Sequence, residues 1–223
     1  MGFAEELKMK IIQFELEHPV LCNRYMIVDE ASGEAAIIDP AWYEGVLQDE
    51  VEKLEGIRIK YILLTHGHFD HIMGAYELKE ATDALVAIHE ADEECLYDPQ
   101  KSYSEGNMPK DQIPMHADIK LKDGDELKLG ETVIRVMHTP GHTLGSVCYI
   151  IEDEKLIFSG DTLFCMTVGR TDLYGGNEAT LCESLRKLLA LEGDYRILAG
   201  HSRETNLDRE RTRNRFIRRM DKQ

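Results

Sequence analysis

The chain has 223 residues, a length that suits one large domain with a substantial core and is short for two. Hydrophobic residues make up 43% of it and charged residues 30%, which is ordinary for a soluble globular enzyme. The net charge of -16 argues against nucleic acid or an anionic membrane surface as the main partner. We therefore expect a single domain over residues 1–223 that acts on a small molecule. The oligomeric state stays open.

The cysteines are widely spaced, odd in number and form no Cys-x-x-Cys pair. This pattern fits free thiols in a reducing compartment better than a disulfide framework or a thiolate metal site. The N-terminal sequence MGFAEELKMK lacks an apolar signal core, and no run approaches membrane-spanning length. We expect a cytoplasmic protein with no membrane partner.

The first half of the chain reads as a β-meander followed by alternating helices and strands. Short apolar segments predict strands at 11–14, 25–28, 35–38, 57–64 and 85–88. The second and third of these flank a polar turn and should form a hairpin. Apolar residues at helical spacing predict helices over 44–54 and about 72–80, the first ending near Gly56.

The segment 97–118 is the least regular part of the chain, with several prolines and few apolar residues. We interpret it as a long surface loop, and long ordered loops in compact domains are often functional. It could cover a functional site or form a mobile insertion, and the sequence leaves both open.

Strand signals resume after this loop. Apolar or alternating segments predict strands from Ile119 onward and at 132–137, 147–151, 156–158 and 196–199. Helical spacing predicts an amphipathic helix over 178–191 and a basic helix over 206–220, whose charge order suits the helix dipole. Both halves run from strands to a helix, which suggests two similar layered units packed together in one domain.

The stretch Thr65-His66-Gly67-His68-Phe69-Asp70-His71 directly follows the apolar run 61–64. It crowds imidazoles and a carboxylate into the loop at the end of a predicted buried strand. Imidazole and carboxylate together suit Zn, Fe or Mn, whereas calcium and magnesium prefer all-oxygen shells. We interpret the stretch as part of a metal site.

More candidate ligands lie where other apolar segments end. His142 follows the strand predicted at 132–137, Asp161 follows 156–158, and His201 follows 196–199. Each has a glycine beside it, and loops at strand ends are where layered α/β proteins usually place their sites. The repeated placement strengthens the interpretation.

The donor types suggest how these side chains divide between ions. His66, His68 and His142 would give one ion three nitrogen ligands and an open tetrahedral position, the arrangement of catalytic zinc. Asp161 is the natural bridge to a second ion, because a carboxylate can present one oxygen to each.

Asp70, His71 and His201 would give that second ion a comparable shell. Two ions about 3.5–4 Å apart can share a hydroxide and stabilise an oxyanion. We therefore predict two divalent metal ions as cofactors, with Zn first and Fe or Mn as alternatives.

The pattern His-x-His-x-Asp-His, followed by His142, Asp161 and His201, resembles the metallo-β-lactamase superfamily and, within it, the glyoxalase II-type hydrolases. The likeness includes the segments TPGHT, GDTLF and GRTD at 139–143, 160–164 and 169–172. It runs from about Phe14 to Arg215, nearly the whole chain. The resemblance implies an α/β fold, a four-layer αββα sandwich of two mixed β-sheets flanked by helices, with the metals at the edge between the sheets.

Two departures separate the chain from full-length glyoxalase II enzymes, which carry a C-terminal helical domain that holds glutathione. Only 22 residues follow His201 here, so we expect a likeness to the shorter, single-domain members. Ser202 and Arg203 also stand where that group often has Gly-Pro. Both departures leave glutathione specificity open without touching the predicted ligands.

We hypothesise that the protein hydrolyses a thioester such as a hydroxyacylglutathione, using a hydroxide that bridges two metal ions. Asp70 would orient the hydroxide as well as bind metal. A thioester suits this site because a thiolate leaves readily, since thiol pKa values are about 8.5. Arg170 would either form a salt bridge that orders the site or contact an anionic substrate.

Other functions stay open at this point. His66, His142 and Asp161 alone form a two-histidine, one-carboxylate set that suits a single Fe(II). Persulfide dioxygenases of the same superfamily look like this and share the Gly-Arg-Thr-Asp stretch. Lactone, β-lactam or other ester hydrolysis is chemically possible at the same site. A non-catalytic binding module that kept the fold is a further alternative, and the complete ligand set argues against it.

Overall fold

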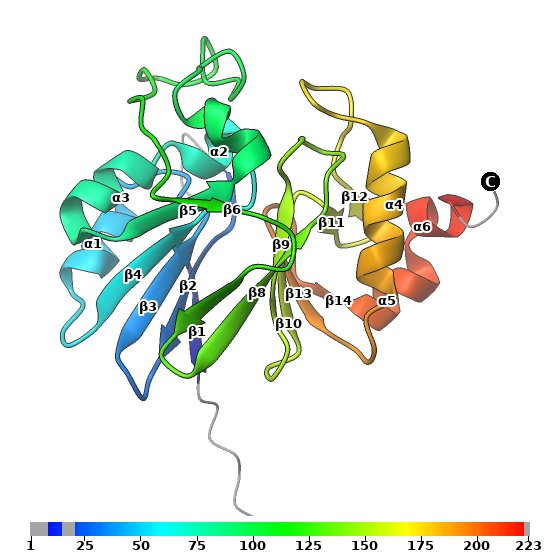
Figure 1. The fold of residues 1–223 in the computed structure, drawn as a ribbon, viewed down its shortest axis with the longest axis horizontal. Coiled ribbons are helices and arrows are strands. Elements are labelled where there is room, and N and C mark those ends of the chain that lie inside the picture. The colour runs from blue at the N-terminus through cyan, green and yellow to red at the C-terminus, as the bar shows by residue number, and fades with distance from the viewer. Residues whose placement is uncertain (1–8, 15–20, 221–223) are drawn as a thin grey trace, which may run out of the picture.

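The computed structural model describes residues 9–14 and 21–220. Two six-stranded sheets face each other, and helices cover the outer face of each (Figure 1). The four-layer αββα sandwich with two mixed sheets is therefore confirmed. The prediction of one domain over residues 1–223 extends beyond the described residues and stays a prediction.

The first sheet contains the N-terminal strands in chain order. They are β1 (Met9–Phe14), β2 (Arg24–Asp29), β3 (Glu34–Ile38), β4 (Arg58–Leu63), β5 (Leu85–His89) and β6 (Ile119–Leu121). The pairings up to β3 are antiparallel, which includes the predicted β2–β3 hairpin, and the later ones are parallel. Helices α1 (Val46–Glu52) and α3 (Ala75–Thr82) lie on its outer face (Figure 1).

The second sheet takes its strands in the order β14 (Thr205–Asn206), β13 (Arg196–Ala199), β10 (Leu156–Gly160), β9 (Val147–Ile151), β8 (Thr132–His138) and β7 (Glu126–Leu129). Strands β10 and β13 run parallel, and the other pairs are antiparallel. Helix α4 (Glu178–Leu189) and the C-terminal helices α5 (Leu207–Arg213) and α6 (Arg215–Met220) cover this sheet (Figure 1).

Successive side chains along the central strands point to opposite faces of the sheet, and this explains the two layers of the core. In β2, Tyr25 and Ile27 point into the layer between the sheets, whereas Met26 and Val28 pack in the layer under the helices. Both faces of the strand are thus buried, and its sequence reads as a continuous apolar run instead of an alternating one. The same burial on both faces applies to β9 and β10, where every residue is buried.

The single helix predicted over 206–220 is wrong, because the chain leaves the helical conformation at Asn214, where ψ is 122°. The Asn214 side-chain amide donates to the Thr167 carbonyl at 3.1 Å and to Glu210 Oε2 at 2.8 Å. Its Oδ1 accepts from the Phe216 N–H at 3.0 Å and so satisfies a free donor at the start of α6. Side-chain hydrogen bonds that compete with the helix ladder therefore divide it in two.

Several short elements have no counterpart in the prediction. They are α2 (Phe69–Ile72), the 3₁₀ helix η1 (Glu90–Leu96), and the two-residue strands β11 (Leu163–Phe164), β12 (Thr167–Val168) and β14. Elements of this length are too short to show a periodic pattern. The helix predicted over about 72–80 is interrupted at Gly74 and begins anew at Ala75. The segment 97–118 contains neither helix nor strand, as predicted.

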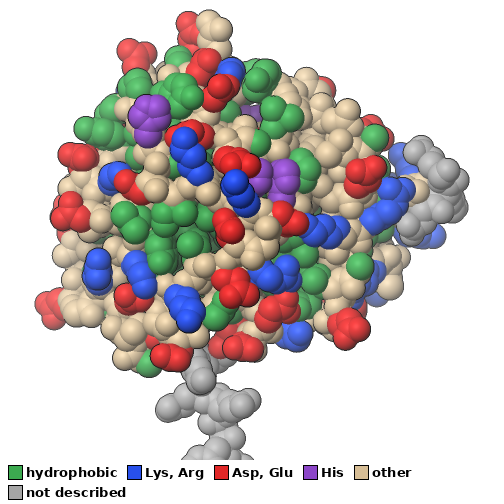
Figure 2. Space-filling model, in the orientation of Figure 1, with side chains coloured by type: hydrophobic (Ala, Val, Ile, Leu, Met, Phe, Trp, Pro, Cys, Tyr) green, Lys and Arg blue, Asp and Glu red, His purple; other side chains and the backbone are tan. Residues whose placement is uncertain are grey.

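Among the described residues, no helix is long and apolar enough to cross a membrane. On the face shown in Figure 2, acidic and basic side chains lie side by side.

Candidate metal centre

Loops from four strand ends meet at one edge of the sandwich. They follow β4, β8, β10 and β13, and helix α2 continues the first of them. The structure brings together all the side chains predicted as ligands: His66, His68, Asp70, His71, His142, Asp161 and His201. Most of them are fully buried, while Asp70 and His201 keep 24% and 33% of their side chains exposed.

One group of donors lies between the β4, β8 and β10 loops. His66 Nε2 is 3.1 Å from His68 Nδ1, and His142 Nε2 is 3.5 Å from Asp161 Oδ2. The rings of His66, His68 and His142 pack edge to face with centroids 4.6–4.8 Å apart. Ligand atoms about 2.0–2.1 Å from a tetrahedral zinc lie about 3.3 Å from one another, so this spacing fits one ion.

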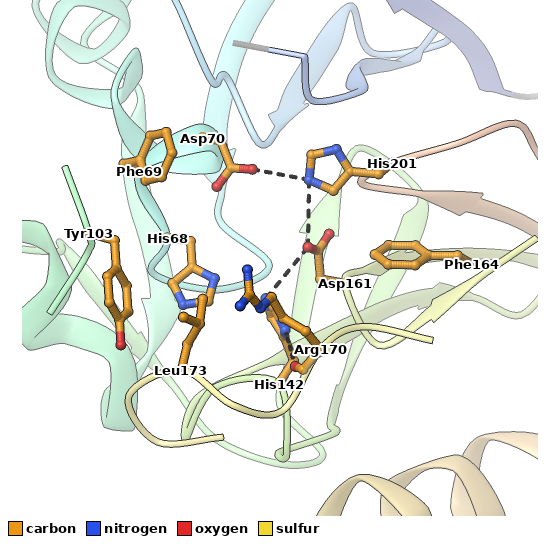
Figure 3. A pocket seen from close by; sticks show the side chains of 10 residues that line it. All are labelled: His68, Phe69, Asp70, Tyr103, His142, Asp161, Phe164, Arg170, Leu173 and His201. Atoms are coloured by element: carbon orange, nitrogen blue, oxygen red, sulfur yellow. Dashed lines mark hydrogen bonds and ion pairs between the residues drawn. The ribbon is translucent and has the colours of Figure 1, made fainter. Parts of the chain in front are cut away.

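A second group meets the first at Asp161 (Figure 3). His201 Nε2 is 3.1 Å from Asp70 Oδ2 and 3.6 Å from Asp161 Oδ2. His71 Nε2 is 3.4 Å from Asp161 Oδ1 and 3.8 Å from Asp70 Oδ2. The spacing again suits one ion. Asp161 therefore lies between the two groups, with its Oδ2 near His142 and His201 and its Oδ1 near His71.

Four of the imidazoles are oriented by a contact outside the cluster. In each case Nδ1 faces an oxygen, so that Nε2 points inward, as is usual for metal-binding histidines. The pairs are His66 with Thr65 Oγ1 at 3.1 Å, His71 with Asp39 Oδ2 at 2.8 Å, His142 with the Arg170 carbonyl at 2.7 Å and His201 with the Leu21 carbonyl at 3.0 Å.

Unpaired buried atoms show that the cluster is chemically incomplete by itself. His68 Nε2, His142 Nε2 and Asp161 Oδ1 are buried and have no hydrogen-bond partner. Each such atom costs about 1–3 kcal/mol unless something pairs with it. A divalent ion would satisfy His142 Nε2 and Asp161 Oδ1. Neutral imidazoles with carboxylates are also a donor set that Zn, Fe and Mn accept, so the residues fit a metal.

The environment of His66, His68 and Asp70 favours the protonation states that bind metal. Burial and the neighbouring imidazoles hold the pKa of His66 well below its usual value, and burial lowers the pKa of His68 to about 3. Both rings are therefore neutral near pH 7. Burial alone would raise the pKa of Asp70, but His71 and His201 outweigh it and lower that pKa, so the carboxylate is ionised.

Asp39 is a functional residue that the sequence analysis missed. Its Oδ2 accepts from the Thr65 hydroxyl at 2.7 Å and contacts His71 Nδ1, and its Oδ1 accepts from the Thr65 N–H at 2.8 Å. It therefore fixes the start of the histidine loop. Cys22, also missed, places its Sγ 3.4 Å from His71 Nδ1, and burial raises the pKa of its thiol to about 12.

Asp92, on η1, ties the two histidine-bearing loops together. Its carboxylate accepts from Gly67 N at 3.0 Å in the first loop, and from Thr143 Oγ1 and Gly145 N, both at 2.6 Å, in the loop of His142. The Asp92 residue is only 2% exposed. It makes no contact with the donors and acts on their position.

Gly200 permits the close approach of the β13 loop to the cluster. A Cβ at this position would lie 2.5 Å from Asp161 Oδ1 and 2.6 Å from His71 Cε1. Any other residue would therefore displace donor side chains.

A cavity of about 420 Å³ opens over the cluster (Figure 3). This volume suits a small molecule. Its lining comprises His68, Phe69, Asp70, Tyr103, His142, Asp161, Phe164, Arg170, Leu173 and His201. Segment 97–118 therefore contributes to the site through Tyr103, which favours the first of the two roles considered for it.

Arg170 lines this cavity and also forms an ion pair. Its Nε and Nη2 each lie 2.7 Å from a carboxylate oxygen of Asp172, and both side chains are more than 60% exposed. The guanidinium lowers the pKa of Asp172 to about 2. A contact between Arg170 and a substrate stays a prediction.

Comparison with known proteins places these features in a family. The family model described as the metallo-beta-lactamase superfamily matches residues 19–201. The probable metallo-hydrolase YqgX of Bacillus subtilis is 36% identical over 201 residues, which cover 89% of this chain and 93% of that protein. The hydroxyacylglutathione hydrolase GloC of Haemophilus influenzae is 34% identical over 186 residues, 82% of this chain and 87% of that protein.

Solved structures agree with this placement. The BLEG-1 B3 metallo-beta-lactamase matches with a TM-score of 0.83 at 33% identity, over 93% of this chain and 99% of that one. TTHA1623, solved in a di-iron-bound form, gives 0.80 at 31% identity over 91% and 98%. ETHE1 from Myxococcus xanthus gives 0.76 at 28% identity over 95% and 90%.

Proposed function

The chain belongs to the metallo-β-lactamase superfamily, and we propose that it is a metal-dependent hydrolase of thioesters such as a hydroxyacylglutathione. The observation that carries the proposal is Asp161, whose two oxygens face two groups of donor atoms at the bottom of an open cavity. The likeness to a hydroxyacylglutathione hydrolase over most of both chains supports the substrate class.

We propose two metal ions that share Asp161. The remaining donors divide into His66, His68 and His142 for one ion and Asp70, His71 and His201 for the other. When bound, such a pair lowers the pKa of a water molecule towards about 7 and stabilises negative charge on a carbonyl oxygen. Zn is the first candidate, and Fe and Mn also suit these donors; the di-iron-bound relative shows that iron occurs among similar proteins.

Asp70 has the position and charge to orient the attacking water. Its carboxylate is ionised, touches His201 Nε2 at 3.1 Å and keeps 24% of its surface open to the cavity. An oxygen not used for metal binding can accept a hydrogen bond from the water. Holding the nucleophile in one orientation removes part of the entropic barrier to attack.

The cavity lining supports a substrate with a good leaving group. The carboxylates among its lining residues are Asp70 and Asp161, which both belong to the proposed ligand sets. Neither is free to protonate a poor leaving group. A thiolate needs no such acid, because thiols have pKa values of about 8.5.

Turnover of S-D-lactoylglutathione, an uncharged thioester, a lactone and a β-lactam by one fully metallated sample tests this proposal. We expect the highest kcat/KM on a thioester, and an Asp161→Ala variant to lose that activity. Absence of thioester turnover in a sample with bound metal would refute the proposal. Preferred turnover of the lactone or β-lactam would replace the thioester with another ester or amide.

A mono-iron dioxygenase acting on a persulfide is the second candidate. It is favoured by the packing of His66 against His142, with ring centroids 4.7 Å apart, and by the 3.5 Å approach of His142 to Asp161. These three side chains suffice to hold one Fe(II). One iron per chain, together with oxygen consumption on glutathione persulfide, would favour this candidate over hydrolysis.

A further inference from the structure

Tyr103 is the only tyrosine among the described residues that line the cavity. Its ring packs edge to face on His68, with the centroids 5.6 Å apart. In Figure 3 it lies at the opposite end of the cavity from Phe164, with the donor cluster between them. A substrate whose reacting carbonyl lies over the cluster would therefore meet Tyr103 with one of its two arms.

The backbone of Tyr103 adopts a conformation that a bulky side chain normally avoids, with φ at +61°. Such residues persist only where their surroundings fix them, and they concentrate at functional sites. Both neighbours of Tyr103 are fixed here. The buried hydroxyls of Ser102 and Ser104 donate to Gln112 Oε1 at 2.6 and 2.8 Å, and Gln112 Nε2 donates to the Cys95 carbonyl at 2.7 Å.

Further contacts connect Tyr103 to both sides of the cavity. The Ser102 carbonyl accepts from the Phe69 N–H at 2.8 Å, at the first residue of the helix that carries Asp70. On the other side, the Tyr103 hydroxyl accepts from the Tyr174 N–H at 2.5 Å. Lys101 adds a cation–π contact, 5.5 Å from the centre of the Tyr174 ring. Tyr103 is therefore held between two loops as part of the wall.

The surroundings of this wall suit an uncharged group. Phe69 and Leu173 line the cavity together with Tyr103, and both are apolar. Arg170 is the cation among the lining residues, and its guanidinium already pairs with both oxygens of Asp172. An acyl or thiol arm without charge would thus meet an apolar wall of fixed position.

We propose that Tyr103 is a specificity-determining residue whose ring limits the length of the uncharged substrate arm that lies beside His68. This inference rests on the proposed thioester hydrolysis for its substrate class. A tyrosine held in this way acts as a stop for that arm, because the hydrogen bonds of its neighbours and of its own hydroxyl oppose its displacement.

Two series of uncharged thioesters test the proposal. One varies the acyl group of N-acetylcysteamine thioesters from acetyl to octanoyl, and the other keeps acetyl and varies the thiol from ethanethiol to octanethiol. Tyr103→Ala should raise the ratio of kcat/KM for the longest to the shortest member at least tenfold in one series. Tyr103→Phe keeps the ring, so its ratios should stay within threefold of the native protein.

Tyr97→Ala is the matched control, because Tyr97 lies in the same segment and packs on His116 away from the cavity. Its ratios should stay within twofold of the native values. Metal content measured on every variant shows whether an altered ratio reflects a changed cavity wall or a loss of bound ions.

A binding measurement keeps the test independent of turnover. Octanohydroxamate and acetohydroxamate are metal-binding probes that differ only in their apolar arm, and Tyr103→Ala should raise the ratio of their affinities at least tenfold. A native protein that binds hydroxamates but hydrolyses no thioester would refute the proposed function while leaving this test in force. Unchanged ratios in both thioester series and in hydroxamate binding would overturn the role of Tyr103.

Discussion

The donor cluster and the mouth of the cavity adjoin each other, yet the protein holds their side chains in different ways. The cluster lies at the buried ends of strands, and its imidazoles are oriented by backbone carbonyls, Asp39 and Thr65. At the mouth, Arg170 and Asp172 pair with each other in solvent, and the residue Tyr174 is 49% exposed.

This difference separates two properties of the site. Substitutions behind the cluster should change metal binding, because they disturb groups that have no alternative partner. Substitutions at the mouth should leave metal binding unchanged, because solvent can replace the contacts that they remove. They should change substrate preference instead. Tyr103 belongs to the mouth by position, but buried hydrogen bonds on both neighbours hold it like a residue of the cluster.

The largest effect is expected for Asp161→Ala, which removes the carboxylate that faces both donor groups. We expect kcat/KM to fall by about a thousandfold or more, because several kcal/mol of transition-state stabilisation disappear with the ions. Elemental analysis should show fewer bound ions in the same sample. Asp153→Ala in the exposed β9–β10 turn is the control. An Asp161→Ala variant with native activity would show that the donor cluster is not needed for activity.

Asp92→Ala should have the next largest effect, although Asp92 contacts no donor atom. Removing it leaves the Gly67 and Gly145 N–H groups without their acceptor and frees the two histidine loops. Loss of a partner that bonds a ligand directly typically weakens metal binding by about 10- to 100-fold, so for Asp92, which acts through the loop backbone, we expect a loss at the lower end of that range. Competition with a chelator measures this change.

The matched control for Asp92 is Glu90→Ala, because Glu90 lies on the same short helix and its side chain is 50% exposed. Its metal affinity should equal that of the native protein. Equal affinities for all three proteins would show that the loops keep their positions without Asp92.

Arg170→Ala, at the mouth of the cavity, should give the smallest effect. Exposed ion pairs contribute about 0–1 kcal/mol, so we expect KM for S-D-lactoylglutathione to rise by no more than about fivefold. Metal content should stay at the native level. A hundredfold loss of kcat/KM at native metal content would show that Arg170 contacts the substrate, whereas a loss of metal would place it among the residues that support the cluster.

The strands and the donor cluster could be predicted because both depend on local patterns, whereas the four-layer arrangement was implied by the resemblance to the metallo-β-lactamase superfamily. Apolar segments marked the strands, and histidines or aspartates directly after them marked the loops. Asp39 obeys the same rule, since it follows β3 directly, and that signal could have identified it. The division of the C-terminal helix could not be foreseen, because Asn214 depends on Thr167 in the distant strand β12.

Asp92 and Tyr103 were missed for a different reason. The partners of Asp92 are Gly67, Thr143 and Gly145, which are far from it in the chain and are brought close only by the packing of the two sheets. Tyr103 lies in a segment without periodic pattern, and its φ angle is a property of the folded chain. Such supporting and wall residues leave no local signature.

The number of metal ions per chain tests the central claim most directly, because the proposed division of the donors around Asp161 predicts two. Elemental analysis of protein purified without added metal, repeated after dialysis against micromolar zinc and removal of excess, gives this number. The geometry predicts two ions per native chain at saturation. One ion or none per native chain at saturation would contradict the paired centre.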